Sequence, residues 1–299
     1  MLQVIAIGLI SAGIYALFAV GVVLVYRGTK VLTFAGGEVG TAALYVTAFL
    51  VTSHGMPWFV GALVAVVLAA GLGAVFELGL VRWSRDADPV VTSILTVALS
   101  ATIFATEINL YGNNPTTLKT PVAVGSGIDV DGVIVSPIQI AAIVVAGLLG
   151  FGLQAFLRRT DFGLAILAAA DDSTATRLVG VRVSRIRVVL WASSFALAAV
   201  AALLVEPTIG VITPGYASTL YLGGLAAAVI GGLDSLPGAV VGATVLGLAQ
   251  SFADRYLKDL GLSGLDYVVT LALLLVVLLV RSYAPELRKR LTSPVEVTA

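Results

Sequence analysis

The sequence contains no cysteine and a single histidine, His54, among its 299 residues. Disulfide bonds are therefore excluded, and a metal site built on cysteine and histidine ligands is not expected. Charged residues are also scarce, at 11% of the chain, whereas a typical soluble domain has about 25%. The 17 basic and 17 acidic residues cancel, so no excess of positive charge points to a nucleic-acid partner.

Sequence patterns that carry catalytic chemistry are missing as well. The chain has no Gly-x-x-x-x-Gly-Lys-[Ser/Thr] loop, so we do not expect it to hydrolyse nucleotides. It also lacks the Gly-x-Ser-x-Gly elbow of hydrolases and the His-Glu-x-x-His helix of zinc proteases. We therefore predict no enzyme activity, no catalytic residues and no cofactor.

Hydrophobic residues, by contrast, make up 59% of the chain, and the mean hydropathy is +1.06. The apolar runs extend over roughly 18–25 residues without the period-two alternation of barrel strands, which predicts membrane-spanning helices. The fold class is therefore all-α, a polytopic transmembrane helix bundle that forms one domain over residues 1–299.

We expect eight or nine membrane segments, because the segments near 33–52 and 217–254 could re-enter the membrane instead of crossing it. With nine crossings, all but three of the 17 basic residues fall on one side. The positive-inside rule makes that side cytoplasmic, so the N-terminus lies outside and the C-terminus inside. The predicted segments are 4–26, 33–52, 57–81, 89–110, 136–157, 187–206, 217–233, 236–254 and 266–281.

Two loops are long enough to have a function of their own. The outer loop, 111–135, is expected to contain a pair of short strands around 129–132. The inner loop, 158–186, collects much of the basic charge. Within it Asp172 or Ser173 can cap a helix start and Gly180 suits a helix end, which predicts a short cytoplasmic helix suited to docking on a soluble partner.

Two glycine clusters interrupt the apolar pattern, one in each half of the chain. Interrupted segments in both halves of a transporter indicate its pathway, whereas close helix packing alone is the alternative explanation. The first cluster is Gly36, Gly37 and Glu38. The second includes Gly231, Gly232, Ser235, Pro237, Gly238 and Gly242.

Acidic residues within apolar segments are the remaining candidates, since a charge there is costly. Glu77 precedes Arg82 and Arg85, and we expect it at the cytoplasmic interface, paired with a basic neighbour. A proton relay is the sharper alternative for Glu77. Glu107 and Glu206 lie near the outer boundary and are expected to be solvated.

Several of these patterns together resemble the branched-chain amino acid ABC transporter permease family of the LivH type. Residues 231–242, Gly-Gly-Leu-Asp-Ser-Leu-Pro-Gly-Ala-Val-Val-Gly, are similar to its Gly-Gly-x-Gly-Ser-x-x-Gly-Ala-x-x-Gly, with Asp234 at a usual glycine. Residues 34–38 resemble its Asn-Phe-Ala-x-Gly-Glu, with Thr33 at the asparagine. Glu77, Arg82 and Arg85 fit a third motif, and the inner loop fits a fourth one loosely.

The resemblance implies an importer in the plasma (inner) membrane, in which this chain is a permease domain. A second permease chain, identical or homologous, completes the pathway, two cytoplasmic ABC ATPase subunits drive it, and an extracytoplasmic binding protein delivers branched-chain or related small amino acids, amides or urea. The helix at 173–180 then becomes the coupling helix. Its expected ATPase-coupling residues are Asp171, Asp172, Ala175, Arg177, Gly180 and Val181.

Two other functional classes stay open at this stage. An ion-coupled secondary transporter would need carboxylates or unwound carbonyls at the membrane midplane. A structural membrane protein without a pathway would use the glycine clusters for packing only. Uptake driven by an ion gradient without ATP would distinguish the first of these from the importer.

Overall fold

The computed structural model describes residues 1–83, 88–112, 114–118, 127–130, 133–135, 137–257 and 264–292. Within these residues the chain is helical throughout, apart from connecting segments and one short hairpin. The elements are α1 (Leu2–Thr29), α2 (Gly36–His54), α3 (Trp58–Phe76), η1 (Glu77–Val81), α4 (Pro89–Tyr111), β1 (Ile128–Val130), β2 (Val133–Val135), α5 (Pro137–Arg159), α6 (Asp161–Asp171), α7 (Ser173–Leu178), α8 (Val183–Ile209), α9 (Tyr216–Gly231), α10 (Leu236–Tyr256) and α11 (Leu265–Thr292).

Each of the nine predicted segments coincides with a helix, which confirms the all-α transmembrane fold class. The strands β1 and β2 pair antiparallel, so the hairpin expected in the outer loop is also confirmed. The short π-helix η1 continues α3, and α6 and α7 lie within the region 158–186.

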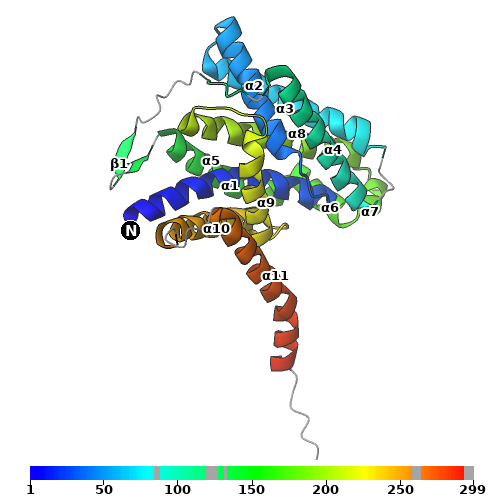
Figure 1. The fold of residues 1–299 in the computed structure, drawn as a ribbon. Coiled ribbons are helices and arrows are strands. Elements are labelled where there is room, and N and C mark those ends of the chain that lie inside the picture. Colours follow the sequence, from blue (N-terminus) through cyan, green and yellow to red (C-terminus); the bar gives the residue numbers. More distant parts are fainter. Residues whose placement is uncertain are drawn as a thin grey trace, which may run out of the picture.

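Helix α1 is the centre of the bundle, and its buried side chains form the core together with those of α8, α9 and α10 (Figure 1). Leu17, Ala19 and Val20 are fully buried, as expected for a helix that is apolar all round. Glycine in α1 permits the close approach of α10, since a Cβ on Gly8 would lie 2.9 Å from the Cα of Leu248 in α10. Small residues at such contacts let helices pack in lipid.

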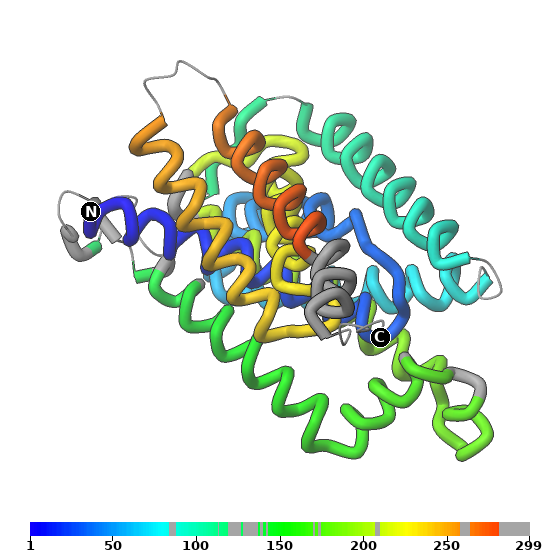
Figure 2. The backbone as a smooth tube through the Cα atoms, turned by 90° about the horizontal axis from the view of Figure 1, so that it is seen from below, coloured from blue at the N-terminus to red at the C-terminus, as the bar shows by residue number. Residues whose placement is uncertain are grey.

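Helices α3, α4 and α11 occupy the periphery. Helix α4 lies on the opposite side of the bundle from α5 (Figure 2), and Val90, Ile94 and Leu110 are among its exposed apolar side chains. Helix α11 extends away from the body of the bundle (Figure 1). These exposed apolar faces suit lipid or another membrane-embedded chain.

Five helical segments of the described chain are long and apolar enough to cross a membrane: α1, α3 with η1, α4, α8 and α10. The pair α5–α6, bent by 87°, gives a sixth span if counted as one. Helix α9 and residues 265–280 of α11 are shorter apolar helices. The count of eight or nine crossings and the orientation of the termini therefore stay predictions.

We call the end of the bundle that carries Arg27, Arg82, Arg158 and Arg182 the basic end. The end of α1, the end of α5 and the start of α8 meet there, because Arg27 donates to Gln154 of α5 over 2.8 Å and a Cβ at Gly28 would overlap Leu190 of α8. Helices α6 and α7 also lie there, far from the N-terminus (Figures 1 and 2).

Candidate functional site

The chain between α1 and α2 runs through the bundle without helical structure. Val31, Thr33 and Ala35 are buried, and protein groups satisfy this backbone. The amide of Phe34 donates to the Thr96 hydroxyl over 3.0 Å, and Tyr221 donates to the carbonyl of Thr33 over 2.7 Å. Irregular backbone at membrane depth is tolerated where protein buries it, so α2 can begin inside the bundle.

The start of α2 is pressed against the start of α9. A Cβ at Gly36 would overlap the ring of Tyr221, and a Cβ at Gly37 would lie 2.5 Å from the Cα of Ser218. The Thr41 hydroxyl accepts a hydrogen bond from the Ala217 amide over 3.0 Å. These two glycines are therefore required by close approach, and two helix N-termini meet in the interior.

Carboxyl groups occupy this junction between α2 and α9. Ser218 donates to Glu38 Oε1 over 2.7 Å, and the amide of Gly215, which precedes α9, donates to Glu107 Oε2 over 3.2 Å. The carboxyl groups of Glu38 and Glu107 also interact with each other. The N-terminus of a helix favours negative charge, so α9 offsets part of the cost of burying these carboxyl groups. We call Glu38, Glu107, Gly215 and Ser218 the polar junction.

Apart from the contact between the two carboxyl groups, several polar atoms around the polar junction have no hydrogen-bond partner among the described residues. They include Glu38 Oε2, Glu107 Oε1 and the hydroxyl of Tyr45, whose ring stacks on that of Tyr111 with centroids 4.2 Å apart. Buried polar groups normally have partners, and unpaired ones inside a membrane protein indicate function. The polar junction is thus the strongest interior site in the described chain.

The expectation that Glu107 and Glu206 are solvated is wrong. Their exposed fractions are 3% and 0%. Hydropathy places both residues near a helix end. The segments that follow α4 and α8 pair with each other, because Thr116 forms a bridge with Ile212, so the ends of these two helices are held together. No group of three or more His, Cys, Asp or Glu side chains gathers in the part of the chain that the structure describes.

The second glycine cluster forms a tight turn at the basic end instead of joining the polar junction. A Cβ at Gly231 would overlap the backbone of Gly238, and one at Gly242 would lie 2.6 Å from the amide nitrogen of Gly231. Ser235 caps α10 by accepting from the Gly238 amide over 3.0 Å. Gly232 has φ 95°, a conformation that favours glycine, and Pro237 lies in the first turn of α10, where proline is tolerated.

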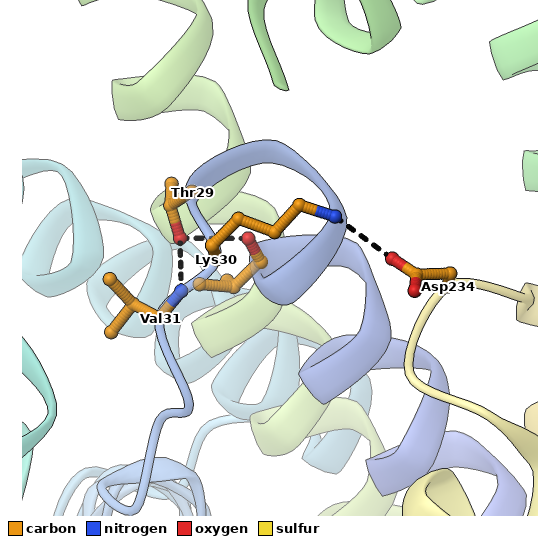
Figure 3. Close-up of polar contacts among 5 residues, drawn as sticks. Thr29, Lys30, Val31 and Asp234 are labelled. Atoms are coloured by element: carbon orange, nitrogen blue, oxygen red, sulfur yellow. Dashed lines mark hydrogen bonds and ion pairs between the residues drawn. The ribbon is translucent and has the colours of Figure 1, made fainter. Parts of the chain in front are cut away.

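An ion pair joins this turn to the end of α1. Lys30 Nζ lies 3.0 Å from Asp234 Oδ1, and both side chains are largely exposed (Figure 3). Among the described non-glycine residues only Lys30 has a positive φ, of 57°, and it ends α1 in the left-handed conformation. Asp234 stands where the LivH-type motif usually has glycine, and in this chain its carboxylate pairs with Lys30.

Glu77 pairs with an arginine that is distant in sequence. Its carboxylate lies 3.2 Å from Nε of Arg187 in α8, and both side chains are mostly buried. Arg82 is exposed, and Arg85 lies outside the described residues. The pair clamps η1 to α8 at the basic end, which favours a structural role over a proton relay.

The predicted short helix is present as α7, and its caps are those expected. Asp172 accepts from the Ala175 amide over 3.0 Å, and Gly180 has φ 87°. Leu178 and Val179 are 84% and 78% exposed, so the helix presents an apolar tip. Sequence reasoning missed α6, although Thr160, which accepts from the Gly163 amide over 3.0 Å, is a recognisable cap.

The chain matches the family described as "Branched-chain amino acid transport system / permease component" over residues 4–278. It therefore belongs to this family of transport permease subunits, which are not enzymes. Taken with its apolar helices, this makes it a multi-pass protein of the inner membrane.

Three curated relatives agree with this assignment. The high-affinity branched-chain amino acid transport system permease protein BraD of Pseudomonas aeruginosa is 32% identical, over 94% of both chains. LivH of Escherichia coli is 29% identical over 91% of both chains. The probable branched-chain amino acid transport permease protein LivH of Methanocaldococcus jannaschii is 28% identical, over 92% of this chain and 89% of its own.

Proposed function

We propose that this chain is the permease subunit of an ABC importer for branched-chain or related small amino acids, with small amides and urea as further candidates. A second permease chain completes the pathway, two separate ATPase subunits drive it, and an extracytoplasmic binding protein delivers the substrate. The observation that carries the proposal is the family match along residues 4–278.

Helix α7 supports the ATPase part of the proposal. Its connections to α6 and α8 keep it at the basic end, and Leu178 and Val179 are exposed. Such an apolar tip suits a groove on a soluble subunit. The coupling residues are those expected from the sequence: Asp171, Asp172, Ala175, Arg177, Gly180 and Val181.

Co-purification tests this docking. Ala175→Glu puts a bulky charge on an exposed face of α7 and should abolish recovery of the ATPase while the permease stays in the membrane. Val90→Glu is the control, because Val90 is 61% exposed in the first turn of α4, where an acidic residue is favoured. Full recovery of the ATPase with Ala175→Glu would remove α7 from the interface.

Transport itself is tested in proteoliposomes that hold the permeases, the ATPases and the loaded binding protein. Uptake of labelled leucine should require ATP, and thermal-shift screening of the binding protein against amino acids, amides and urea identifies the substrate. We assign the specificity to the binding protein, because Gly36 and Gly37 pack directly against Tyr221 and Ser218.

One observation favours an ion-coupled secondary transporter as the second candidate. Glu38 of α2 and Glu107 of α4 are buried carboxyl groups inside the helix bundle, and ion-coupled transporters use such groups. Uptake in vesicles that lack ATP but hold a proton gradient would support this candidate. Failure of uptake under both conditions would instead favour a structural role without a pathway.

A further inference from the structure

A hollow of about 420 Å³ lies at the basic end, between the end of α7 and the first turns of α8. Among the described residues, its wall includes four arginines and no acidic residue. The arginines are Arg177, Arg182, Arg185 and Arg187, and Ser184 with two valines completes the wall. We call this the arginine hollow.

The charges of the arginine hollow are mostly uncompensated by the side chains that the structure describes. The ion pairs among the described residues are Lys30–Asp234 and Arg187–Glu77, so Arg177, Arg182 and Arg185 form none there. The nearest acidic residue in sequence, Asp172, accepts from an amide of α7. Like charges that share one hollow repel each other, and a bound anion would remove that repulsion.

The start of α8 adds to the positive potential of the hollow. The helix begins after Arg182 without a side-chain cap and has no acidic residue in its first turn. An α-helix carries roughly half a positive charge at its N-terminus. Residues 183–185 of this first turn line the hollow, so the helix end and the guanidinium groups favour the same ligand.

The position of the hollow indicates which anion it meets. Helix α8 is long and apolar enough to cross a membrane, and its uninterrupted apolar run begins just after Arg187. Arg187 contacts η1, whose Leu78 and Leu80 are about half exposed. The hollow therefore opens where an apolar surface meets water, at the depth of lipid headgroups. Arginine forks match phosphate oxygens in two-point hydrogen bonds.

We propose that the arginine hollow binds the phosphodiester headgroup of an anionic phospholipid such as phosphatidylglycerol. Basic pockets beside membrane helices on the cytoplasmic side are known to hold such headgroups. Leu178 and Val179 are exposed and do not line the hollow, so this apolar tip is left for the ATPase. A carboxylate of the ATPase in the hollow is the competing occupant, and the test separates the two.

The test compares lipid retention by the full chain in nanodiscs of phosphatidylcholine with increasing phosphatidylglycerol, read by native mass spectrometry. Arg182→Gln with Arg185→Gln should weaken phosphatidylglycerol retention about 100-fold, since each substitution removes a charge-assisted hydrogen bond from guanidinium to phosphate and not only a charge near the surface. The matched control, Arg158→Gln with Arg159→Gln, removes the same charge from exposed positions at the end of α5 and should leave retention unchanged.

A second variant guards against loss of folding or altered insertion. Arg182→Lys with Arg185→Lys keeps both charges but not the guanidinium fork, and an intermediate loss of retention supports the proposal. Equal loss in the α5 control would overturn it, because generic attraction would then explain the binding. The proposal would also be overturned if inorganic phosphate stabilised the chain equally well in pure phosphatidylcholine. It would likewise be overturned if the Arg182→Gln/Arg185→Gln variant lost ATPase recovery but kept its lipid retention.

Discussion

Replacing Gly242 with alanine should destabilise the bundle, although alanine is the better helix former. The added Cβ would lie 2.6 Å from the amide nitrogen and 2.9 Å from the Cα of Gly231. Both are backbone atoms of α9, so no side chain can rotate away, and the helices must separate by several tenths of an ångström. Overpacking of this kind costs about 1–3 kcal/mol, which exceeds the gain of about 1 kcal/mol from helix propensity.

Gly147→Ala in α5 is the matched control, because a Cβ there meets nothing within 4 Å. This control should be stabilised by about 0.5–1 kcal/mol, so the two variants should differ by about 2 kcal/mol. Unfolding in mixed micelles by increasing denaturing detergent, followed by tryptophan fluorescence, measures the difference. If the two variants were equally stable, close helix packing would not explain Gly242, and the explanation that the glycine cluster belongs to the transport pathway would be retained.

Three further predictions concern ionic groups. Glu77→Gln should cost about 3 kcal/mol because it leaves Arg187 buried without its charge partner, and adding Arg187→Gln should recover part of that loss in the same unfolding assay. Glu107→Gln keeps an oxygen for the Gly215 amide and should stay within about 1 kcal/mol of the parent chain, whereas Glu107→Leu should cost about 1–3 kcal/mol; equal effects would mean that this hydrogen bond is unimportant. Asp234→Gly should change stability by less than about 1 kcal/mol, because the Lys30–Asp234 pair is exposed, and a larger loss in a thermal-shift assay would contradict this.

The helices were predictable from the sequence because hydropathy and length determine them locally. The caps at Asp172 and Gly180 were predictable for the same reason, since capping involves neighbours in the chain. Contacts between distant segments were not predictable. Nothing near Glu77 in sequence identifies Arg187 as its partner, and hydropathy alone could not show that Glu107 is buried beside Glu38.

The two glycine clusters show why a pattern could indicate a site without revealing its geometry. Both clusters contain small residues next to a break in a helix, so the sequence treats them alike. In the structure Gly36 and Gly37 let a second helix start approach within the bundle, whereas Gly231 and Gly242 let two helices join in a turn at its end. Only the first cluster carries a buried carboxyl group, Glu38, and this difference makes it the better candidate for transport chemistry.

Helix α8 connects the proposed docking region to the polar junction. One end of α8 follows α7 and is held to η1 by the Arg187–Glu77 pair. In its second half α8 contacts α2 two residues beyond Glu38, where a Cβ at Gly40 would lie 3.0 Å from Cβ of Ala202. Because packed helices shift as units between discrete arrangements, a displacement of α7 by an ATPase would move α8 against α2. Under the proposed function, Gly40 is therefore the position where a larger side chain should uncouple ATP hydrolysis from uptake while leaving ATPase docking on α7 intact.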